Sequence, residues 1–300
     1  EVEFVEEDRI WILDDDFDDR AGIQAEVKAV STATQSTPWG ITRVGGPADG
    51  TGKVAWVIDT GVDQTHPDLN VDQARSAEFV TWGTGSNSIN DGNGHGTHVA
   101  GTIGAKNDGN GVVGVAAGAT IVGVKVLADN GSGSTSDIVK GCNYVANTGA
   151  PGDVANLSLG GGASTSLDNA VKGIAAKGIY TCVAAGNSAR KASNYSPARA
   201  NAPNLYTISA FGQTTNPSRP DPFASFSNYG DRNTNSPIDY SEPGVSVLST
   251  YKNGQYATLS GTSMAAPHAA GILLVRGGTF GTGGKVSSDK DNVPDTIGTR

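Results

Sequence analysis

Continuous apolar runs alternate along this chain with segments of helical pattern. The runs are Val54–Ile58, Val154–Leu159 and Ile179–Ala185, and residues 136–147 and 167–177 are predicted to be helices. A continuous apolar run is typical of a strand that is buried on both faces of a parallel sheet. Strands that alternate with helices connect as βαβ units. The sequence therefore predicts an α/β fold with a central, mainly parallel sheet flanked by helices.

Polar side chains lie at the ends of these runs. Asp59 follows the first run, Ser158 lies at the end of the second, and Asn187 follows the third. The carboxyl ends of parallel strands meet at one edge of a sheet, where open α/β sheets place functional groups. We therefore expect these side chains to share a site. For Asp59 the alternative is an ordinary turn residue ahead of Gly61.

His95 lies where a glycine-rich loop over residues 90–96 leads into a predicted helix. His98 follows three residues later, so it lies on nearly the same helix face. A metal pair is one interpretation of these two histidines. It is a weak one, because no glutamate or third histidine stands at the spacing of a zinc site.

The stretch Leu259–Leu273 is crowded with small residues around Ser263, and it predicts a closely packed helix. Proline is tolerated in the first turn of a helix, so Pro267 predicts a helix start at about Thr262 or Ser263. A serine at a helix N-terminus is most often a cap. It can also be a nucleophile, because the free N–H groups and the helix dipole favour negative charge there. That role requires a base, an orienting acid and an oxyanion donor elsewhere in the chain.

Asp59, His95, Asn187 and Ser263 together supply every group that catalysis by a serine nucleophile needs. Seven stretches then carry a resemblance: Asp59–Gly61, His95–Gly101, Ser158–Gly161, Ala184–Asn187, Asn194–Pro197, Phe226–Gly230 and Gly261–His268. With these stretches in this order, the chain resembles the subtilisin-like serine proteases, or subtilases. It is similar to their proteinase K group. The resemblance covers about residues 37–275 and implies a three-layer subtilisin-like fold.

The resemblance implies a role for each residue of this constellation. Ser263 Oγ would attack the scissile carbonyl, and His95 would take its proton and later give it to the leaving amine. Asp59 would orient His95 and stabilise its charged form. The Asn187 amide and the Ser263 backbone N–H would form the oxyanion hole. No cofactor would be needed for this chemistry.

The resemblance also implies how a substrate binds. Two segments with little side chain would clamp an extended peptide as an added strand, and a third would line a roomy, uncharged pocket. The clamping residues are Gly131, Ser132, Gly133, Ser158, Leu159 and Gly160, and the pocket residues are Ala184, Ala185 and Gly186. Broad specificity, with apolar or aromatic residues preferred before the cut, is the expectation.

Structural calcium is common in the resembled family. In proteinase K-like members two loop carbonyls and an aspartate bind it, and the matching positions here are Pro203, Leu205 and Asp239. Subtilisin-like members use another loop, matched by Asp68 and the region of Asp108. For each carboxylate the alternative is an ordinary turn residue.

The N-terminal segment 1–36 holds eleven acids and three bases, so it carries −8 of the net charge of −9. Residues 1–13 alternate apolar and charged side chains, which predicts a strand with one solvated face. Its residues 2–8 resemble the last strand of an inhibitory subtilase propeptide. We expect the segment to be the enzyme's own inhibitor, cut between about Ala29 and Thr37; the alternative is a permanent extension.

The catalytic domain is expected over 37–276, and residues 277–300 read as a Gly-rich, polar tail. The acids between Asp289 and Asp295 alternate as in a calcium loop, but the other ligands are lacking, so a solvated tail is predicted. Cys142 and Cys182 are either two buried thiols or one disulfide.

We expect a secreted endopeptidase that acts on extended polypeptides. No run of apolar residues is long enough to span a membrane, and lysine and arginine do not cluster as on a nucleic-acid surface. Two other uses of the same triad are an esterase and a peptide ligase. An alternative of another class is a catalytically silent subtilase fold that binds peptides or calcium. A metal hydrolase built on His95 and His98 is the third class.

Overall fold

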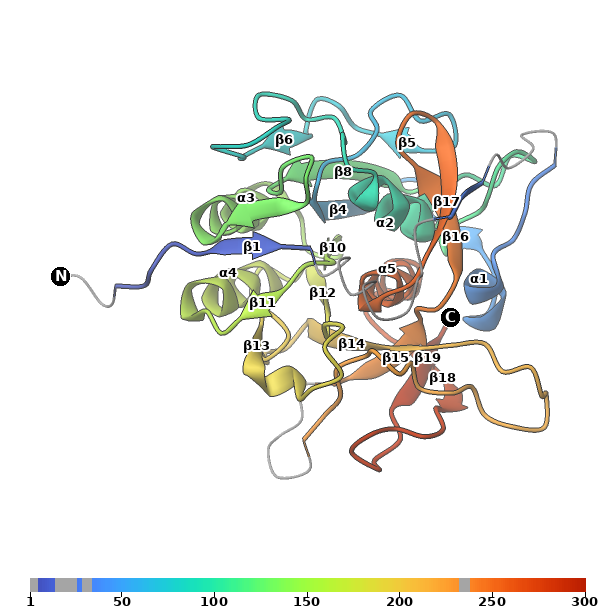
Figure 1. Ribbon diagram of the computed structural model, residues 1–300. Helices are drawn as coiled ribbons and strands as arrows, with labels where there is room; N and C mark the ends of the chain where they lie inside the picture. The colour runs from blue at the N-terminus through green and yellow to red at the C-terminus, as the bar shows by residue number, and fades with distance from the viewer. Residues whose placement is uncertain (1–4, 14–25, 29–33, 232–237) are drawn as a thin grey trace.

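The computed structural model of the chain describes residues 5–13, 26–28, 34–231 and 238–300 (Figure 1). Its centre is a ten-stranded sheet with the order β18-β19-β15-β14-β12-β10-β4-β8-β5, in which β6 also pairs with β8. The strands of this sheet are β4 (Val54–Asp59), β5 (Asn70–Val71), β6 (Ala77–Glu78), β8 (Thr120–Lys125), β10 (Val154–Leu157), β12 (Tyr180–Ala184), β14 (Leu205–Phe211), β15 (Tyr240–Pro243), β18 (Gly281–Lys285) and β19 (Thr296–Thr299).

Helices cover both faces of this sheet (Figure 1). The helices are α1 (Trp39–Arg43), α2 (His95–Gly104), α3 (Thr135–Thr148), α4 (Thr165–Ala175) and α5 (Thr262–Arg276), with a 3₁₀ turn η2 (Ala192–Asn194). One apolar core joins the sheet to α2 and α5, and a second joins it to α3 and α4. The three-layer α/β fold expected from the sequence is therefore confirmed.

The pairings from β5 through β8, β4, β10, β12, β14 and β15 to β19 are all parallel. Within the described part of the central sheet, only the edge strand β18 runs antiparallel to its neighbour. Asp59, Ser158 and Asn187 follow or end the parallel strands β4, β10 and β12. They consequently reach the same edge of the sheet, as their positions in the sequence predicted.

Smaller sheets surround this edge. Their strands are β1 (Ile10–Ile12) with β9 (Ser132–Ser134), β3 (Ala48–Asp49) with β7 (Ala116–Ala117), β11 (Gly161–Gly162) with β13 (Tyr195–Ser196), and β16 (Val247–Tyr251) with β17 (Gln255–Leu259) and β2 (Glu26–Lys28). The strand predicted over residues 1–13 is thus β1 alone within the described residues. The acidic run 14–19 and most of the following linker lie outside them.

The prediction of a solvated C-terminal tail is wrong. β18 and β19 form a hairpin, and β19 pairs with β15 and so extends the central sheet. Val286 and Ile297 are buried against Phe211 and Phe223, which gives the hairpin its own apolar contact. Burial of these few side chains stabilises a segment whose glycines alone would favour a loop.

Cys142 and Cys182 are both free and buried, in the two cores on opposite faces of the sheet, so the disulfide is not formed. Among the described residues, none of the helices is both long and apolar enough to cross a bilayer.

Candidate active site

Asp59 and His95 meet at the carboxyl edge of the sheet, where β4 ends and α2 begins. His95 Nδ1 lies 2.7 Å from Asp59 Oδ1, and both side chains are buried. The same Asp59 oxygen accepts the Thr60 backbone N–H at 2.7 Å. A carboxylate at Nδ1 fixes the tautomer and the orientation of the ring, so that Nε2 is the nitrogen left for proton transfer.

A second buried carboxylate, Asp91, holds the start of α2 in place. It accepts hydrogen bonds from the hydroxyls of Thr60 and Thr97 and from the backbone N–H groups of Gly94 and Thr97. These bonds satisfy N–H groups that a helix N-terminus leaves free. Gly96 is required by close packing, since a Cβ there would lie 2.0 Å from the carbonyl oxygen of Gly61. Loop and helix therefore fix the position of His95 together.

His98 does not form a metal site with His95. Its Nε2 lies 3.0 Å from the Val247 carbonyl and 3.1 Å from the Ala257 carbonyl, so it donates to the β16–β17 hairpin. Burial, together with the nearby charge of His95, lowers the pKa of His98 to about 3. Among the described residues no group of three or more histidine, cysteine or acidic side chains could hold a metal.

Ser263 is the second residue of α5, whose first residue is Thr262, as predicted. Pro267 falls in the second turn rather than the first, so it lacks the N–H that would bond to the Ser263 carbonyl. The Ser158 hydroxyl donates to that carbonyl instead, at 2.7 Å. The proline thus leaves an acceptor that ties α5 to the end of β10, and this bond positions Ser263.

Asn187 is oriented by its own acceptor oxygen. Its Oδ1 accepts both the backbone N–H and the hydroxyl of Thr262 at 2.9 Å. The Nδ2 amide is therefore the end that is left to donate a hydrogen bond at the site. Asn228 holds the loop from the other side by donating to the Ala185 carbonyl and accepting the Ser188 N–H.

One pocket joins the predicted oxyanion donor, the nucleophile and two of the three predicted substrate segments. It is lined by Ser158, Leu159, Gly160, Gly161, Ala184, Ala185, Gly186, Asn187, Tyr195, Ser196, Ala198, Thr262 and Ser263. Among the described residues, the Tyr195 phenol is the one ionisable group that lines this pocket. The third predicted segment, Gly131–Gly133, overlaps β9 and is paired with β1.

The N-terminal strand lies along β9 as an added antiparallel strand. Trp11 pairs with Gly133, and the Leu13 N–H donates to the Gly131 carbonyl at 3.0 Å. β1 therefore occupies a segment that the sequence assigned to substrate (Figure 1). The sequence suggested the strand and the clamp separately but did not predict that they would pair.

Two acids of the same segment dock on helix N-termini. The Asp8 carboxylate accepts the Ser136 N–H and hydroxyl at the start of α3, at 2.9 and 2.8 Å. The Glu6 carboxylate accepts the Ser166 N–H and hydroxyl at the start of α4, at 2.8 and 3.0 Å. Helix N-termini favour anions, so the acidity of this segment contributes directly to its docking.

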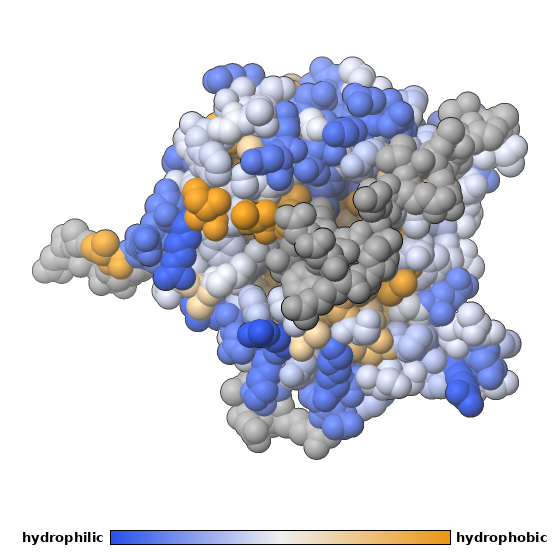
Figure 2. Space-filling model, viewed as in Figure 1, coloured by the Kyte–Doolittle hydropathy of each residue, from blue (hydrophilic) through white to orange (hydrophobic). Residues whose placement is uncertain are grey.

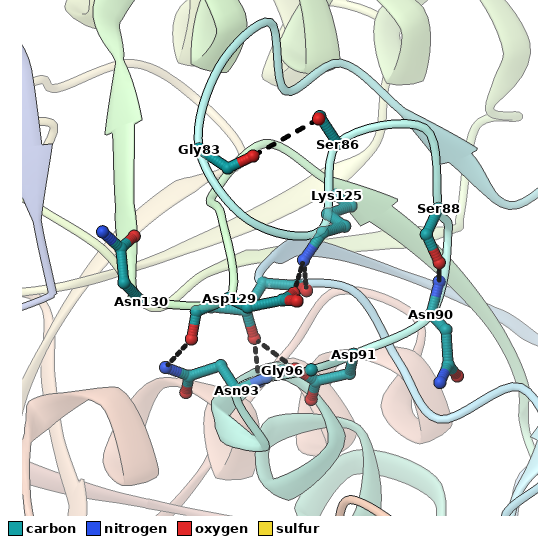
Figure 3. A network of polar contacts seen from close by, with 12 residues as sticks. Gly83, Ser86, Ser88, Asn90, Asp91, Asn93, Gly96, Lys125, Asp129 and Asn130 are labelled. Atoms are coloured by element: carbon teal, nitrogen blue, oxygen red, sulfur yellow. Dashed lines mark hydrogen bonds and ion pairs between the residues drawn. The ribbon is translucent and has the colours of Figure 1, made fainter.

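Lys125 is a site residue that the sequence analysis missed. Its fully buried Nζ donates to the Thr60 carbonyl and, at 2.9 Å, to Asp129 Oδ1 (Figure 3). Asn93, in the loop before His95, donates to the Asp129 carbonyl at 3.1 Å. The ammonium thereby connects the end of β4 to the loop at Asp129, which Asn93 joins to the loop before His95. The available signal was a lysine inside the otherwise apolar run 121–127.

The residues around Asp68 fit a calcium ion. Gln35 Nε2 donates to the carbonyl oxygens of Lys106, Asn110 and Val112 at 2.7, 3.2 and 3.0 Å, so these three oxygens converge. Asp68 Oδ2 accepts the Val112 N–H, whereas its buried Oδ1 has no hydrogen-bond partner among the described residues. Carbonyl and carboxylate oxygens are the ligands that Ca²⁺ prefers.

The charge at Asp68 supports the same conclusion. Burial, with the nearby charge of Asp108, raises the pKa of Asp68 to about 6. A cation at this place would lower it again. Gln35 was not predicted as a ligand, because it precedes the first family motif and nothing near it marks a cation site.

The second calcium prediction has less support. Asp239 Oδ2 accepts the Thr207 N–H at 2.8 Å. Asp239 thus lies beside the start of β14, which begins at Leu205. No convergence of the Pro203 and Leu205 carbonyls on it is seen among the described residues. The acids at 289–295 bond mainly to their own loop, as in Asp289 with Asp295 N–H.

This fold and site define a class, namely an α/β protein with an Asp–His pair and a helix-borne serine at one sheet edge. The chain belongs to the Subtilase family (peptidase S8), whose model matches residues 50–276.

Named relatives agree with this assignment. The chain is 41% identical over 296 residues to subtilisin-like serine protease AsES of Sarocladium strictum, covering 93% of this chain and 66% of that protein. It is 45% identical over 253 residues to M-protease of Shouchella clausii, covering 82% of this chain and 61% of that protein. It is 45% identical over 248 residues to Subtilisin Savinase of Lederbergia lenta, covering 80% of this chain and 84% of that protein. The chain therefore spans less than two thirds of the first two relatives.

A solved structure of a cold adapted subtilisin-like serine proteinase has a similar fold. It superimposes with a TM-score of 0.67 at 37% identity, and the match covers 83% of this chain and 89% of that one.

Proposed function

We propose that this chain is a serine endopeptidase. Ser263 Oγ attacks the peptide carbonyl while His95 accepts its proton, and His95 then protonates the leaving amine. Asp59 stabilises the imidazolium, and the Asn187 amide and Ser263 N–H donate to the oxyanion. Water then gives a proton to His95 and attacks the carbonyl of the acyl-enzyme. Ser263 Oγ leaves and takes the proton back from His95, which releases the acid product. The observation that carries the proposal is the 2.7 Å contact of His95 Nδ1 with Asp59 Oδ1 at the end of β4, next to the parallel strand β10, whose end lines a pocket with Ser263 and Asn187.

Extended polypeptides are the proposed substrates, bound along Ser132–Ser134 in the way that β1 binds. The small, uncharged lining of the pocket favours apolar or aromatic residues before the cut, with broad tolerance elsewhere. Secretion is proposed on the resemblance alone.

Proteolytic activity should disappear in Ser263→Ala while the fold persists, because one buried oxygen is removed. Casein clearing by the wild type should also be blocked by a fluorophosphonate that labels Ser263. A folded wild type that neither clears casein nor takes the label would support the silent, peptide-binding alternative. Resistance to the label with loss of activity in a zinc chelator would support a metal hydrolase.

The N-terminal segment is proposed to be the enzyme's own inhibitor, because its strand occupies the substrate side of β9. Self-cleavage is expected between about Ala29 and Thr37. Gln35 and Ser36 are fastened to the 106–112 loop, so a cut before them would keep both on the mature enzyme.

N-terminal sequencing of the wild type beside Ser263→Ala tests this processing. Trimming should occur only when Ser263 is present. An active wild type that still begins at Glu1 would contradict the inhibitor assignment. A start close to residue 15 would instead place the cut directly after the docked strand and outside the predicted range.

A structural calcium ion is proposed at Asp68, with Gln35, the three converging carbonyls and Asp108 as neighbouring oxygen donors. The ion would tie the start of the catalytic domain to the loop after α2 and would take no part in the reaction. Chelation should lower the melting temperature, since a ligand that binds only the folded state stabilises it. The effect should vanish in Asp68→Asn and remain in Asp239→Asn. Identical melting curves in chelator and in millimolar calcium would contradict the proposed site.

A further inference from the structure

Asn228 is a buried side chain that lies against the loop carrying Asn187. It belongs to the segment between β14 and β15. Its Nδ2 donates to the Ala185 carbonyl at 2.8 Å, and its Oδ1 accepts the N–H groups of Ser188 and Arg190 at 3.1 and 2.9 Å. One short side chain therefore bonds to the backbone on both sides of Asn187.

The main chain of the same segment also lies directly on this loop. The Asn228 N–H donates to the Gly186 carbonyl at 2.8 Å, and the Ala189 N–H donates to the Phe226 carbonyl at 2.8 Å. Gly186 has a φ of +98°, and a Cβ there would lie 2.5 Å from Asn228 Nδ2. A glycine at this position therefore lets the loop approach the amide closely.

Ala189 shows that the loop is held in an unfavourable backbone shape. Its φ of 54° lies in the left-handed region, which alanine rarely adopts. Such a conformation persists only where the surrounding contacts hold it. The two neighbours of Ala189 in the chain, Ser188 and Arg190, are the residues whose N–H groups Asn228 accepts. The Asn228 side chain consequently holds a shape that the loop would otherwise leave.

The contacts that Asn187 makes with Thr262 act on the end of its side chain and set the direction of its amide. The place of that amide also depends on the loop backbone that carries it. An oxyanion donor stabilises the transition state only if it is in position before the charge develops. A displacement of about 1 Å can lower a rate by about 10²-fold. Whatever holds this loop therefore affects the reaction.

We propose that Asn228 is a positioning residue for the oxyanion hole and acts on the reaction through Asn187. The inference rests on the proposed peptidase function. The described residues that line the pocket do not include Asn228, so it holds the donor without touching the substrate. Its effect therefore falls on the transition state, in which the oxyanion forms, and not on the binding of the peptide.

The state of β1 has to be matched before variants are compared. This strand is paired with β9, and its outward side chains Ile10 and Ile12 are 57% and 56% exposed. Figure 2 shows apolar side chains on the surface where Figure 1 places β1. A variant that processes itself slowly would keep β1 on β9 and lose activity for that reason alone. Each variant is therefore sequenced from its N-terminus and compared with wild type that has the same start.

The direct test is Asn228→Ala in steady-state kinetics on one peptide substrate. kcat should fall about 10- to 100-fold, because the donor is displaced but not removed, while KM changes less than about twofold. In Asn187→Ala there is no amide left to position, so adding Asn228→Ala to it should lower kcat by less than about twofold. An unchanged kcat, the same loss in both backgrounds, or a loss that appears in KM alone would overturn the proposal.

Ser227→Ala is the matched control. Ser227 is the buried neighbour of Asn228, and its hydroxyl bonds to the Ala210 N–H and the Asn228 carbonyl rather than to the loop. This variant should keep kcat within about twofold of the wild type, even where its melting temperature falls. An equal loss of kcat in Ser227→Ala would overturn the proposal, because general loosening of the segment would then explain it. If Asn228→Ala does not fold, Asn228→Asp takes its place beside Asn187→Ala, since aspartate keeps the shape but loses the amide donor.

The contact can also be tested without catalysis, in the Ser263→Ala chain. Hydrogen exchange of the Ser188 and Arg190 amides reports how often the loop leaves Asn228. Asn228→Ala should speed this exchange about three- to tenfold, because both N–H groups lose their acceptor, and should leave exchange in β12 unchanged. Unchanged exchange at both amides, beside a wild type that cuts peptides, would overturn the role of Asn228 alone. A wild type that neither cuts the peptide nor takes the fluorophosphonate would mean instead that the peptidase function has failed.

Discussion

At the scale of single residues, Asn187 offers the sharpest test of the reaction. Asn187→Ala removes the amide donor, so kcat should fall by about 10²–10³-fold while KM changes little. Steady-state kinetics on a peptide substrate measure both constants. Asn187→Asp is the control, because it keeps an oxygen for the Thr262 N–H and hydroxyl but loses the donor. Full turnover in either variant would remove Asn187 from the oxyanion hole.

The sequence predicted those site residues that stand at the ends of regular elements. Asp59 and Asn187 follow buried strands, and His95 and Ser263 begin helices, so patterning alone placed them at one edge. It could not predict contacts between groups with no pattern of their own. The Ser158 hydroxyl bonds to a backbone carbonyl 105 positions away, which only the folded chain reveals.

At the scale of elements, docking of the N-terminal strand should depend on pH. Burial disfavours the charged form of Glu6, but hydrogen bonds from Ser164 and Ser166 outweigh it and hold the pKa of Glu6 below its usual value. A depressed pKa means that the stabilising contribution is present above the ordinary Glu range and is lost as pH falls through the lowered value. The opening of β1 can be measured by hydrogen exchange of its backbone amides in Ser263→Ala, after correction for the pH dependence of the intrinsic exchange rate. The fraction of molecules in which β1 is open should therefore rise between pH 6 and pH 3.

Glu6→Gln provides the control for this effect. It should loosen β1 at neutral pH and remove the part of the pH dependence that Glu6 supplies. Exchange in the buried strand β4 shows whether the whole domain is opening instead. If the opening of β1 does not depend on pH in Ser263→Ala that retains Glu6, the role of Glu6 is contradicted.

Elements with apolar periodicity were predicted within a few residues, but the C-terminal hairpin was not. β18 reads Gly-Thr-Gly-Gly-Lys, which has neither alternation nor β-branched side chains beyond one threonine. It is a strand because β19 pairs with it and with β15, and a pairing partner far along the chain leaves no local signal. Glycine-rich sequence therefore hid an element that completes the central sheet.

At the scale of the whole molecule, the net charge and the buried carboxyls belong to different parts of the chain. Residues 1–36 carry −8 of the net charge of −9, whereas several carboxyls are buried in the body. Burial raises the pKa of Asp295 to about 7. This carboxyl ionises more easily once the chain unfolds, so it favours unfolding as pH rises.

Glu242 on β15 is the extreme case. It is fully buried, and neither carboxyl oxygen has a hydrogen-bond partner among the described residues. Burial raises its pKa well above the ordinary value, against the opposing charge of Arg43. The C-terminal hairpin lies over this carboxyl, because a Cβ at Gly298 would lie 2.3 Å from Oε1. We infer that the folded chain holds Glu242 as the neutral acid.

The sign of its effect on stability follows directly. Because the folded pKa is raised, the unfolding free energy is unaffected below the unfolded pKa of about 4.3. It then falls by about 1.4 kcal/mol per pH unit until the folded pKa is reached. Glutamine has a similar shape but does not ionise, so the melting temperature of Glu242→Gln should exceed that of the wild type increasingly over a range of rising pH above the unfolded pKa. The exposed Glu7→Gln should show no such trend. A gap between Glu242→Gln and the wild type that is constant over this range would mean that Glu242 is already ionised in the folded chain.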